Sequence, residues 1–449
     1  MSRILGIELR RSAALGSALV LLVVGCVLLF FVGGPVFVTG WLQLAMTQRE
    51  YLAILWPLAL AAGAWQARRE HRSNVAELFA STARPRTHPM VSTLGAMTIA
   101  VVGGYLAMGI AGGLWIIGTA RYLPVSVFAV TAVGGLALIA AVWLGLAIGR
   151  LLPSARTAPA LAVAGLGLLL MLPAATRPWG WLALVFSPIS EMNMPHPYQA
   201  VPNRASVAQA VWLAALAVTA VTLLASSGWR TRVAALLPAV LGAALAITVM
   251  PHQERVVVNA VDPVARELVC AKDEPRVCVS RVHSGLLPEV VVPAREALTL
   301  LAKLPNAPTQ VHEDTTTFFP DFFPPWHEDV VLFDLKVGQN GHLDKTGMQA
   351  AIVSDAFQSP AKCMKSHVTG WDKGLAAAYW LIGREPVASG PKDPTMALGY
   401  DSTDIAKAVQ LWQMLRGLPD NEAKARVAAL RQASGNCSAG EQLSSPSTP

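Results

Sequence analysis

Two similar tripeptides in the second half of the chain are its most obvious candidates for chemistry. His312-Glu-Asp and His327-Glu-Asp each combine an imidazole with two carboxylates, and both groups bind zinc in proteins. Neither tripeptide continues as the H-E-x-x-H helix of a metalloprotease, because position 316 is Thr and position 331 is Val. They could bind a metal only if the fold brought them together, so solvated loop residues are the favoured interpretation.

Other catalytic signatures are missing from the sequence. The segment Ser280-Arg-Val-His283 lacks the G-x-S-x-G turn of a serine hydrolase. The phosphate-binding loop of an ATPase requires a Gly-Lys dipeptide, and none occurs anywhere in the chain. We therefore expect neither an enzyme activity nor a bound cofactor in this chain.

The cysteines point to an oxidising environment for the second half of the chain. One lies in an apolar run and four lie in the C-terminal part: Cys26, and then Cys270, Cys278, Cys363 and Cys437. An even number suits two disulfides, and of the three pairings we favour Cys270–Cys278 with Cys363–Cys437. Zinc is the competing interpretation, but the spacing of Cys270, Cys278 and His283 fits no compact zinc motif.

Composition divides the chain in two. It is 53% hydrophobic and 14% charged, with a mean hydropathy of +0.46, as is typical of an integral membrane protein. Residues 1–250 contain sixteen Arg, five carboxylates and no Lys, so their formal charge is +11. Residues 251–449 contain nineteen basic and 23 acidic residues, giving −4. The pI near 9.3 thus comes from arginines beside apolar runs, and nothing in it indicates nucleic-acid binding.

The apolar runs predict seven helical spans of about 20 residues, the length that crosses the hydrocarbon layer. Their expected ranges are 13–34, 50–66, 91–119, 124–149, 157–173, 206–227 and 233–250. Twelve of the sixteen arginines flank these spans on one side. The other side has four, which are Arg49, Arg121, Arg177 and Arg204. The positive-inside rule makes the first side cytoplasmic. The N-terminus is then cytoplasmic, and seven spans place everything after Met250 outside the cell membrane.

Glycine pairs with G-x-x-x-G spacing occur in two predicted spans, Gly109–Gly113 and Gly145–Gly149. This spacing lets helix backbones approach closely. We favour packing within the chain over a seam between two chains.

The loop Ala67–Met90, ARREHRSNVAELFASTARPRTHPM, is more polar than a helical hairpin needs. Ser73-Asn74 can cap a short helix with an apolar side, and Arg84-Pro-Arg86 can end it. Here the chain resembles the permease subunits of ABC-type exporters of the six-span class. In that family a coupling helix between spans two and three sits in a cleft of the ATPase. The resemblance implies that the ATPase contacts are Glu77, Leu78, Phe79, Ser81, Thr82 and Arg84. A positively charged topology loop without a partner is the alternative.

Two further segments are similar to that family. Ser2–Ser12 can form an amphipathic helix before span one, and a plain stop-transfer flank is the alternative. Pro173–Ala205 is apolar enough to dip into the outer leaflet, as the family's short re-entrant helices do, and an ordinary interfacial anchor is the alternative. The resemblance covers roughly residues 1–230 and implies two partners besides the lipid bilayer. These are a separate ATPase subunit that binds ATP and a second permease chain. Span seven and the exported tail depart from the six-span pattern, and the residue usage resembles GC-rich actinobacterial coding.

The expected fold class is an all-α polytopic membrane bundle followed by an α+β extracytoplasmic domain. The predicted domains are 1–250 and 251–437, with a disordered end at 438–449. Strands are expected at 255–261, 277–280 and 330–335, and helices at 293–303, 346–357, 374–382, 403–415 and 422–432. Two other functions fit this organisation: a membrane anchor that presents a sensor or binding domain, and a tethered extracytoplasmic enzyme.

Overall fold

The structure is a computed structural model that describes residues 13–32, 34–72, 87–189, 197–252, 260–316, 327–343, 345, 347–358, 371–386 and 402–436. The chain divides into two compact units. The first, which we call the helical unit, comprises residues 1–117 and 123–262. The second, the mixed unit, comprises residues 118–122 and 263–449.

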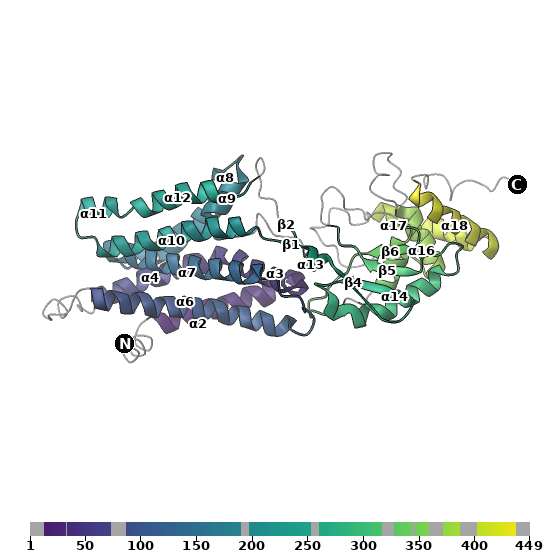
Figure 1. Cartoon of the computed structure of the whole chain (residues 1–449), viewed down its shortest axis with the longest axis horizontal. Helices are drawn as coiled ribbons and strands as arrows, with labels where there is room; N and C mark the ends of the chain where they lie inside the picture. Colours follow the sequence, from purple (N-terminus) through teal and green to yellow (C-terminus); the bar gives the residue numbers. More distant parts are fainter. Residues whose placement is uncertain are drawn as a thin grey trace. The chain divides into compact units, whose positions relative to one another are not determined.

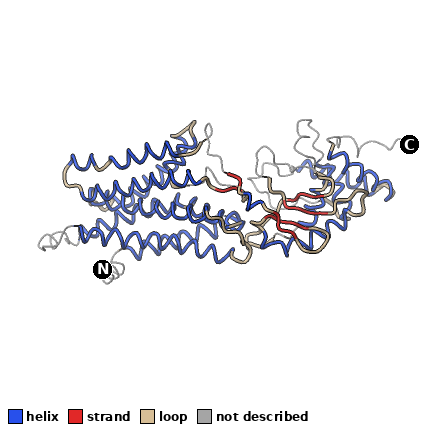
Figure 2. Tube along the Cα trace, viewed as in Figure 1, coloured by secondary structure: helices blue, strands red, loops and turns tan. Residues whose placement is uncertain are grey.

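The described part of the helical unit contains long helices, several short ones and a two-residue strand pair (Figures 1 and 2). Its elements are α2 (Ala14–Val27, extended by a π-helical turn, Leu28–Val32), α3 (Trp41–Glu50), α4 (Leu52–Arg72), α6 (Thr87–Ile116), α7 (Ser126–Leu151), α8 (Thr157–Ala175), α9 (Gly180–Phe186), β1 (Gln199–Ala200), α10 (Asn203–Ala225), α11 (Trp229–Ala234), α12 (Leu237–Val249) and β2 (Ala260–Val261). Apolar side chains at 13–34 and at the later predicted spans therefore do form helices.

Six helices of the described chain are long and apolar enough to cross a membrane. They are Ala14–Val32, Met90–Ile116, Ser126–Leu151, Thr157–Ala175, Asn203–Ala225 and Trp229–Val249. The remaining predicted span, 50–66, lies on α4, which has the length of a span but is not among the six. Its C-terminal part carries Gln66, Arg68 and Arg69, which lower its apolarity.

Close contact between α4 and α7 forms the centre of the helical unit. A Cβ on Gly145 would lie 2.0 Å from the Leu60 carbonyl oxygen, and one on Gly63 would lie 2.1 Å from the Val142 carbonyl oxygen. Gly149 similarly faces Ala64. The two backbones approach this closely because no side chain separates them. The interpretation of Gly145–Gly149 as packing within the chain is confirmed.

One end of the helical unit collects its irregular elements. Figure 1 shows α3, β1 and β2 at this end, with α11 at the other. The strand β1, between α9 and α10, pairs antiparallel with β2, which follows α12, and the Asp262 amide donates to the Tyr198 carbonyl at 2.9 Å. The loop between α9 and α10 and the segment after the last helix therefore meet at the same end of the bundle.

The described residues of the mixed unit form helices and a four-stranded sheet, which is consistent with the expected α+β class. Its elements are α13 (Pro263–Arg266), β3 (Leu268–Cys270), β4 (Val277–Ser280), α14 (Leu287–Leu301), β5 (Gln310–Glu313), β6 (Val330–Phe333), α15 (Met348–Asp355), α16 (Trp371–Ile382), α17 (Ser402–Arg416) and α18 (Asp420–Gly435). The strand order is β3-β4-β5-β6; β3 is antiparallel to β4, while β4, β5 and β6 are mutually parallel.

Burial explains this arrangement. All four residues of β4 are buried, as expected for a strand covered on both faces, whereas β5 and β6 alternate between buried and half-buried positions. Val277, Val311 and Val331 join apolar residues of α14, α15 and α18 in one core. The predicted strands at 277–280 and 330–335 and the five predicted helices are confirmed with shifted ends. The predicted strand at 255–261 falls mostly outside the described residues, apart from β2.

The α4–α7 contact makes a testable prediction. Gly145→Ala places a methyl group against the Leu60 carbonyl, so the helices must separate, and the free energy of unfolding should fall by about 1–3 kcal/mol. Gly135→Ala is the matched control on the same helix, because the nearest atom to its Cβ is Val102 Cγ2 at 4.0 Å. The thermal unfolding midpoints of the purified full-length variants in detergent measure both effects. Equal midpoints for the two variants would contradict the contact.

Candidate functional sites

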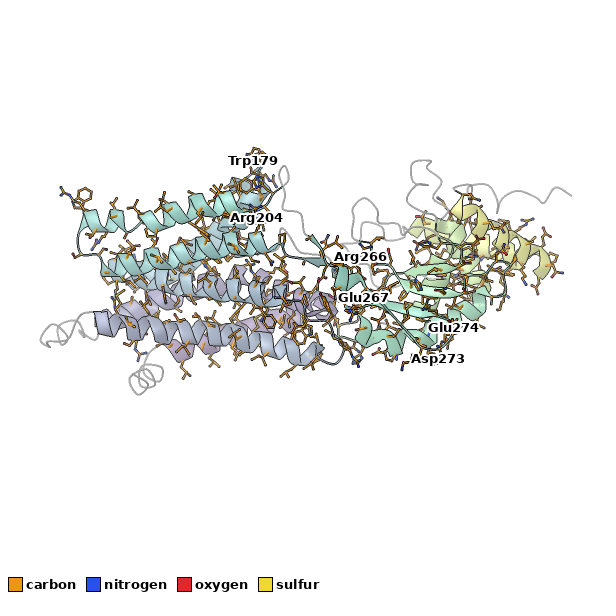
Figure 3. The ribbon with its side chains drawn as sticks, viewed as in Figure 1. Trp179, Arg204, Arg266, Glu267, Asp273 and Glu274 are labelled. Carbon is orange, nitrogen blue, oxygen red and sulfur yellow. A yellow bond between two sulfur atoms is a disulfide. The ribbon has the colours of Figure 1, made fainter. Side chains whose placement is uncertain are left out.

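The six predicted ATPase contacts, Glu77, Leu78, Phe79, Ser81, Thr82 and Arg84, lie outside the described residues, as do Cys363 and Cys437. The other predicted disulfide is present: Cys270 and Cys278 are bonded across the antiparallel pair β3–β4, with their Cα atoms 3.9 Å apart. This bond closes the hairpin whose turn carries Asp273 and Glu274 (Figure 3). Neither cysteine is therefore a metal ligand in this structure.

The helical unit holds a buried polar cluster on α3. This helix is too short to span a membrane, yet Leu42 to Arg49 are all buried. Four of these side chains are polar: Gln43, Thr47, Gln48 and Arg49. We call them, with Tyr105 on α6 and Gln209 on α10, the Arg49 cluster. Burying so many polar groups within an apolar bundle is unfavourable unless they form hydrogen bonds. Their hydrogen-bond partners therefore decide whether this cluster is a functional site.

Arg49 is at the centre of this cluster, and its side chain is 1% exposed. Its Nη1 donates to Gln209 Oε1 at 3.0 Å, and its Nη2 donates to the Pro188 carbonyl oxygen at 2.9 Å. Both acceptors are neutral. Among the described residues, no carboxylate contacts this guanidinium, and its Nε has no hydrogen-bond partner.

Gln209 connects Arg49 to the short helix α9. Its Nε2 donates to the Leu184 carbonyl at 2.8 Å, while Trp212, one turn along α10, donates to the Phe186 carbonyl at 3.3 Å. The last carbonyls of a helix have no partner within the helix, and here side chains of α10 satisfy them. Arg49 donates to a carbonyl just beyond the end of α9, that of Pro188. The position of α9 therefore depends on donors from α3 and α10.

The rest of the cluster borders α6 and α7. Gln48 Nε2 donates to the Tyr105 carbonyl at 3.4 Å and fits against Gly109, where a Cβ would lie 2.8 Å from it. The Tyr105 side chain lies near Arg49, and its hydroxyl faces Gly134. Within the described residues, the hydroxyls of Thr47 and Tyr105 have no hydrogen-bond partner. The cluster is thus a buried cation surrounded by neutral polar groups with spare bonding capacity.

The mixed unit holds a second buried polar group, at the carboxyl ends of its parallel strands. Glu313, the last residue of β5, is 2% exposed and is hydrogen-bonded through Oε1 to His283 Nδ1. The Ser280 amide, at the end of β4, donates to the other carboxylate oxygen at 2.6 Å. The carboxylate therefore ties β5 to the turn that follows β4. Because the parallel strands follow one another in sequence order, this edge has no topological switch point, where open α/β sheets usually form a ligand crevice.

Further carboxylates lie near this pair. Partial burial raises the pKa of Asp355 well above its ordinary value, and the negative charges of Asp334 and Asp314 act in the same direction, while Lys336 opposes them. The unfolded chain ionises such a group at a lower pH than the folded protein does. Between the ordinary Asp pKa and the raised pKa of Asp355, the folded protein therefore binds a proton that the unfolded chain has lost. As the pH rises through this range, the contribution of Asp355 to the free energy of unfolding falls.

The histidine tripeptides do not assemble a metal centre in the described part of the chain. His312 lies on β5, half-buried, with its Nε2 3.1 Å from Gln310 Oε1. Burial lowers its pKa, and the positive charges of Arg276 and His327 lower it further, so His312 is neutral near pH 7. The two tripeptides are thus near enough to interact electrostatically. Nevertheless, the described residues contain no group of three His, Cys, Asp or Glu side chains that could hold a metal ion.

Comparison with known proteins gives no relative. No known family model matches this chain. No curated protein and no solved structure matches it either. Any functional proposal must therefore come from its own residues.

Neither Arg49 nor Glu313 was predicted as a site residue. The sequence places Arg49 beside an apolar run, where it is counted as a loop arginine, and Glu313 within the repeated His-Glu-Asp tripeptide. One signal was available for Arg49: α3 reads Gln-Leu-Ala-Met-Thr-Gln-Arg, and this polar content is unusual directly before a span. Nothing local distinguishes Glu313 from Glu328.

The His283–Glu313 pair makes a prediction about the stability of the mixed unit. Glu313→Gln removes the charge that accepts from both His283 and the Ser280 amide, and should cost about 3 kcal/mol. That corresponds to roughly 100-fold faster hydrogen exchange of the globally protected amides of β4 and β5 in the full-length protein.

Glu267→Gln is the matched control. Glu267 accepts from Arg281 at 2.5 Å, but both side chains are largely exposed, so its loss should cost at most about 1 kcal/mol. Glu267 lies directly before β3, away from the hairpin turn (Figure 3). If both variants exchange at the same rate, the buried pair does not stabilise the sheet.

Proposed function

We propose that this chain is the membrane-spanning permease subunit of an ATP-driven ABC-type exporter. A separate ATPase subunit would dock on the cytoplasmic loop between spans two and three, and a second permease chain, identical or homologous, would complete the pathway. ATP would bind on the partner, because this chain has no phosphate-binding loop.

The observation that supports this proposal best is the buried polar cluster in a bundle otherwise suited to lipid. A bundle serving only as an anchor needs no buried cation, and ionisable groups inside membrane bundles usually serve function. The short helices α3 and α9 also do not cross the bundle, and α9 lies within Pro173–Ala205, the segment that resembles the family's short re-entrant helices. Their contacts with α6, α7 and α10 place polar groups between the spanning helices.

For orientation, we propose that the N-terminus faces the cytoplasm and the mixed unit lies outside the cell membrane. The arginine bias supports this, as does the Cys270–Cys278 disulfide, because disulfides persist in oxidising compartments. The pairing of β1 with β2 is consistent with it, since both would belong to the external side.

A tethered extracytoplasmic enzyme is less well supported. The mixed unit buries Ser280, and its described residues form no metal-binding group. A sensor or binding role for this unit remains compatible with the permease proposal.

Coupling to an ATPase tests the proposal directly. A separate ATPase subunit should co-purify with the detergent-solubilised wild-type chain. Glu77→Lys should lower the substrate-stimulated ATP hydrolysis of this complex by about tenfold or more, because it reverses a charge at the proposed contact. Arg156→Glu, a charge reversal in another predicted cytoplasmic loop, is the control and should hydrolyse ATP as wild type does. Normal coupling in Glu77→Lys would exclude this loop, and absence of any ATPase partner would exclude the proposal.

Orientation is tested with exposed cysteines in intact cells. Lys303→Cys, in the mixed unit, should react with a membrane-impermeant maleimide, whereas Ser154→Cys, between α7 and α8, should react only after permeabilisation. The parent protein provides the background from its native thiols. The reverse labelling pattern would invert the proposed topology.

A further inference from the structure

We infer that Arg49 is an anion-binding residue, occluded in this conformation, and that the molecule handled by the helical unit carries a phosphate or carboxylate group. This inference rests on the proposed function only in calling that molecule a substrate. The binding itself can be tested without an ATPase.

The charge balance of the Arg49 cluster is the first argument. A buried cation is strongly unfavourable unless an opposite charge or several hydrogen bonds compensate it. Arg49 has two described acceptors, Gln209 Oε1 and the Pro188 carbonyl, and both are neutral. A bound anion would supply the missing charge and form the strong, charge-assisted hydrogen bonds that a guanidinium favours.

Spare hydrogen-bond donors are the second argument. A guanidinium has five N–H groups, and the described contacts of Arg49 use two of them. Its Nε lacks a partner within the described residues, as does the hydroxyl of Tyr105, whose side chain lies near Arg49. These groups come from α3 and α6. A tetrahedral phosphate or a planar carboxylate accepts several such donors at once, whereas a neutral or cationic ligand would leave the guanidinium uncompensated.

The position of α9 explains how a residue that is 1% exposed could meet a ligand. Arg49 and Gln209 hold the carbonyls of Pro188 and Leu184, at and just after α9. An anion that binds Arg49 competes with the Pro188 carbonyl for the same guanidinium. Binding would therefore release the segment after α9, and departure of the anion would restore the contact. Arg49 is thus placed to couple ligand binding to the position of this short helix.

The test measures binding of two probes to the full-length protein in nanodiscs of zwitterionic phosphatidylcholine. Inorganic phosphate represents a soluble anion, and dodecyl phosphate represents an anionic amphiphile or lipid headgroup; tryptophan fluorescence reports binding. We expect saturable binding of at least one probe, weakened about 10- to 100-fold by Arg49→Gln and less by Arg49→Lys. Binding of phosphate indicates a soluble substrate, and binding of dodecyl phosphate alone indicates an amphiphile.

Two variants make the result decisive. Gln209→Glu places a carboxylate oxygen at the position 3.0 Å from Arg49 Nη1, so it should pair with the guanidinium within the protein and abolish binding of the anion. The substitution also removes the donor to the Leu184 carbonyl, so its thermal unfolding midpoint is measured beside its anion binding. It also replaces Arg49→Gln if that variant fails to fold. Arg204→Gln is the matched control, since Arg204 is exposed at the start of α10, at the same end of the bundle as Trp179 (Figure 3), and should bind as wild type does.

Two outcomes would overturn the inference: no saturable binding of either probe to the wild type, or unchanged binding in Gln209→Glu. Because no arm contains ATP or an ATPase, the result is independent of the coupling experiment. An ATPase partner without anion binding would leave the exporter proposal standing and remove Arg49 from it. Anion binding without an ATPase partner would support the role of Arg49 and exclude the exporter proposal.

Discussion

The helical unit depends on one constraint: a hydrocarbon layer offers no water, so every backbone group, polar side chain and charge must find its partner within the protein. Long helices meet this requirement for the backbone. At the α4–α7 contact, the backbone groups are already hydrogen-bonded within each helix. Gly63 and Gly145 allow the two backbones to pack directly against each other, where any side chain would keep them apart. The short helix α9 cannot meet this requirement alone, and its terminal carbonyls take donors from Gln209 and Trp212. Around Arg49 the requirement is not fully met, because the described acceptors of this buried cation are neutral and its Nε has no described partner. Arg49 is therefore the best candidate for a functional residue.

The mixed unit solves the related problem of polar groups at strand ends. Its parallel strands terminate at one edge, where backbone amides and carboxylates gather. Glu313 accepts a hydrogen bond from the Ser280 amide and is bonded to His283, so a buried carboxylate joins the end of β5 to the end of β4 and the turn after it. Asp355 shows the cost of the same environment, since burial and neighbouring carboxylates favour its protonated form. The same edge therefore contains a hydrogen-bonded carboxylate, Glu313, and a carboxyl whose ionisation is unfavourable, Asp355.

Much of this fold follows from patterns that act locally. Sustained apolarity predicts the long helices between α2 and α12, whereas the short helices α3 and α9 are not among the predicted spans, and β4 follows from a short apolar run after Pro275. The predicted helix at 293–303 begins too late, since α14 starts at Leu287, with Pro288 in its first turn and Pro293 inside the helix. The strands β3 and β5 were missed for a different reason. Val311 and Glu313 are the buried positions of β5, so the usual alternation of apolar and polar residues is absent, and burial of Glu313 depends on a partner 30 residues away.

Arg49 shows why the candidate site could not be predicted in the same way. Charge counting treats every arginine near a span as a loop residue, because the sequence does not reveal which short segments fold back into the bundle. The buried position of α3 removes Arg49 from the group of flanking arginines on the sparsely charged side, which leaves Arg121, Arg177 and Arg204. The imbalance between the two sides therefore increases when this residue is reassigned. One structural observation thus strengthens the basis for the proposed topology and, at the same time, identifies the arginine whose position topology alone does not explain.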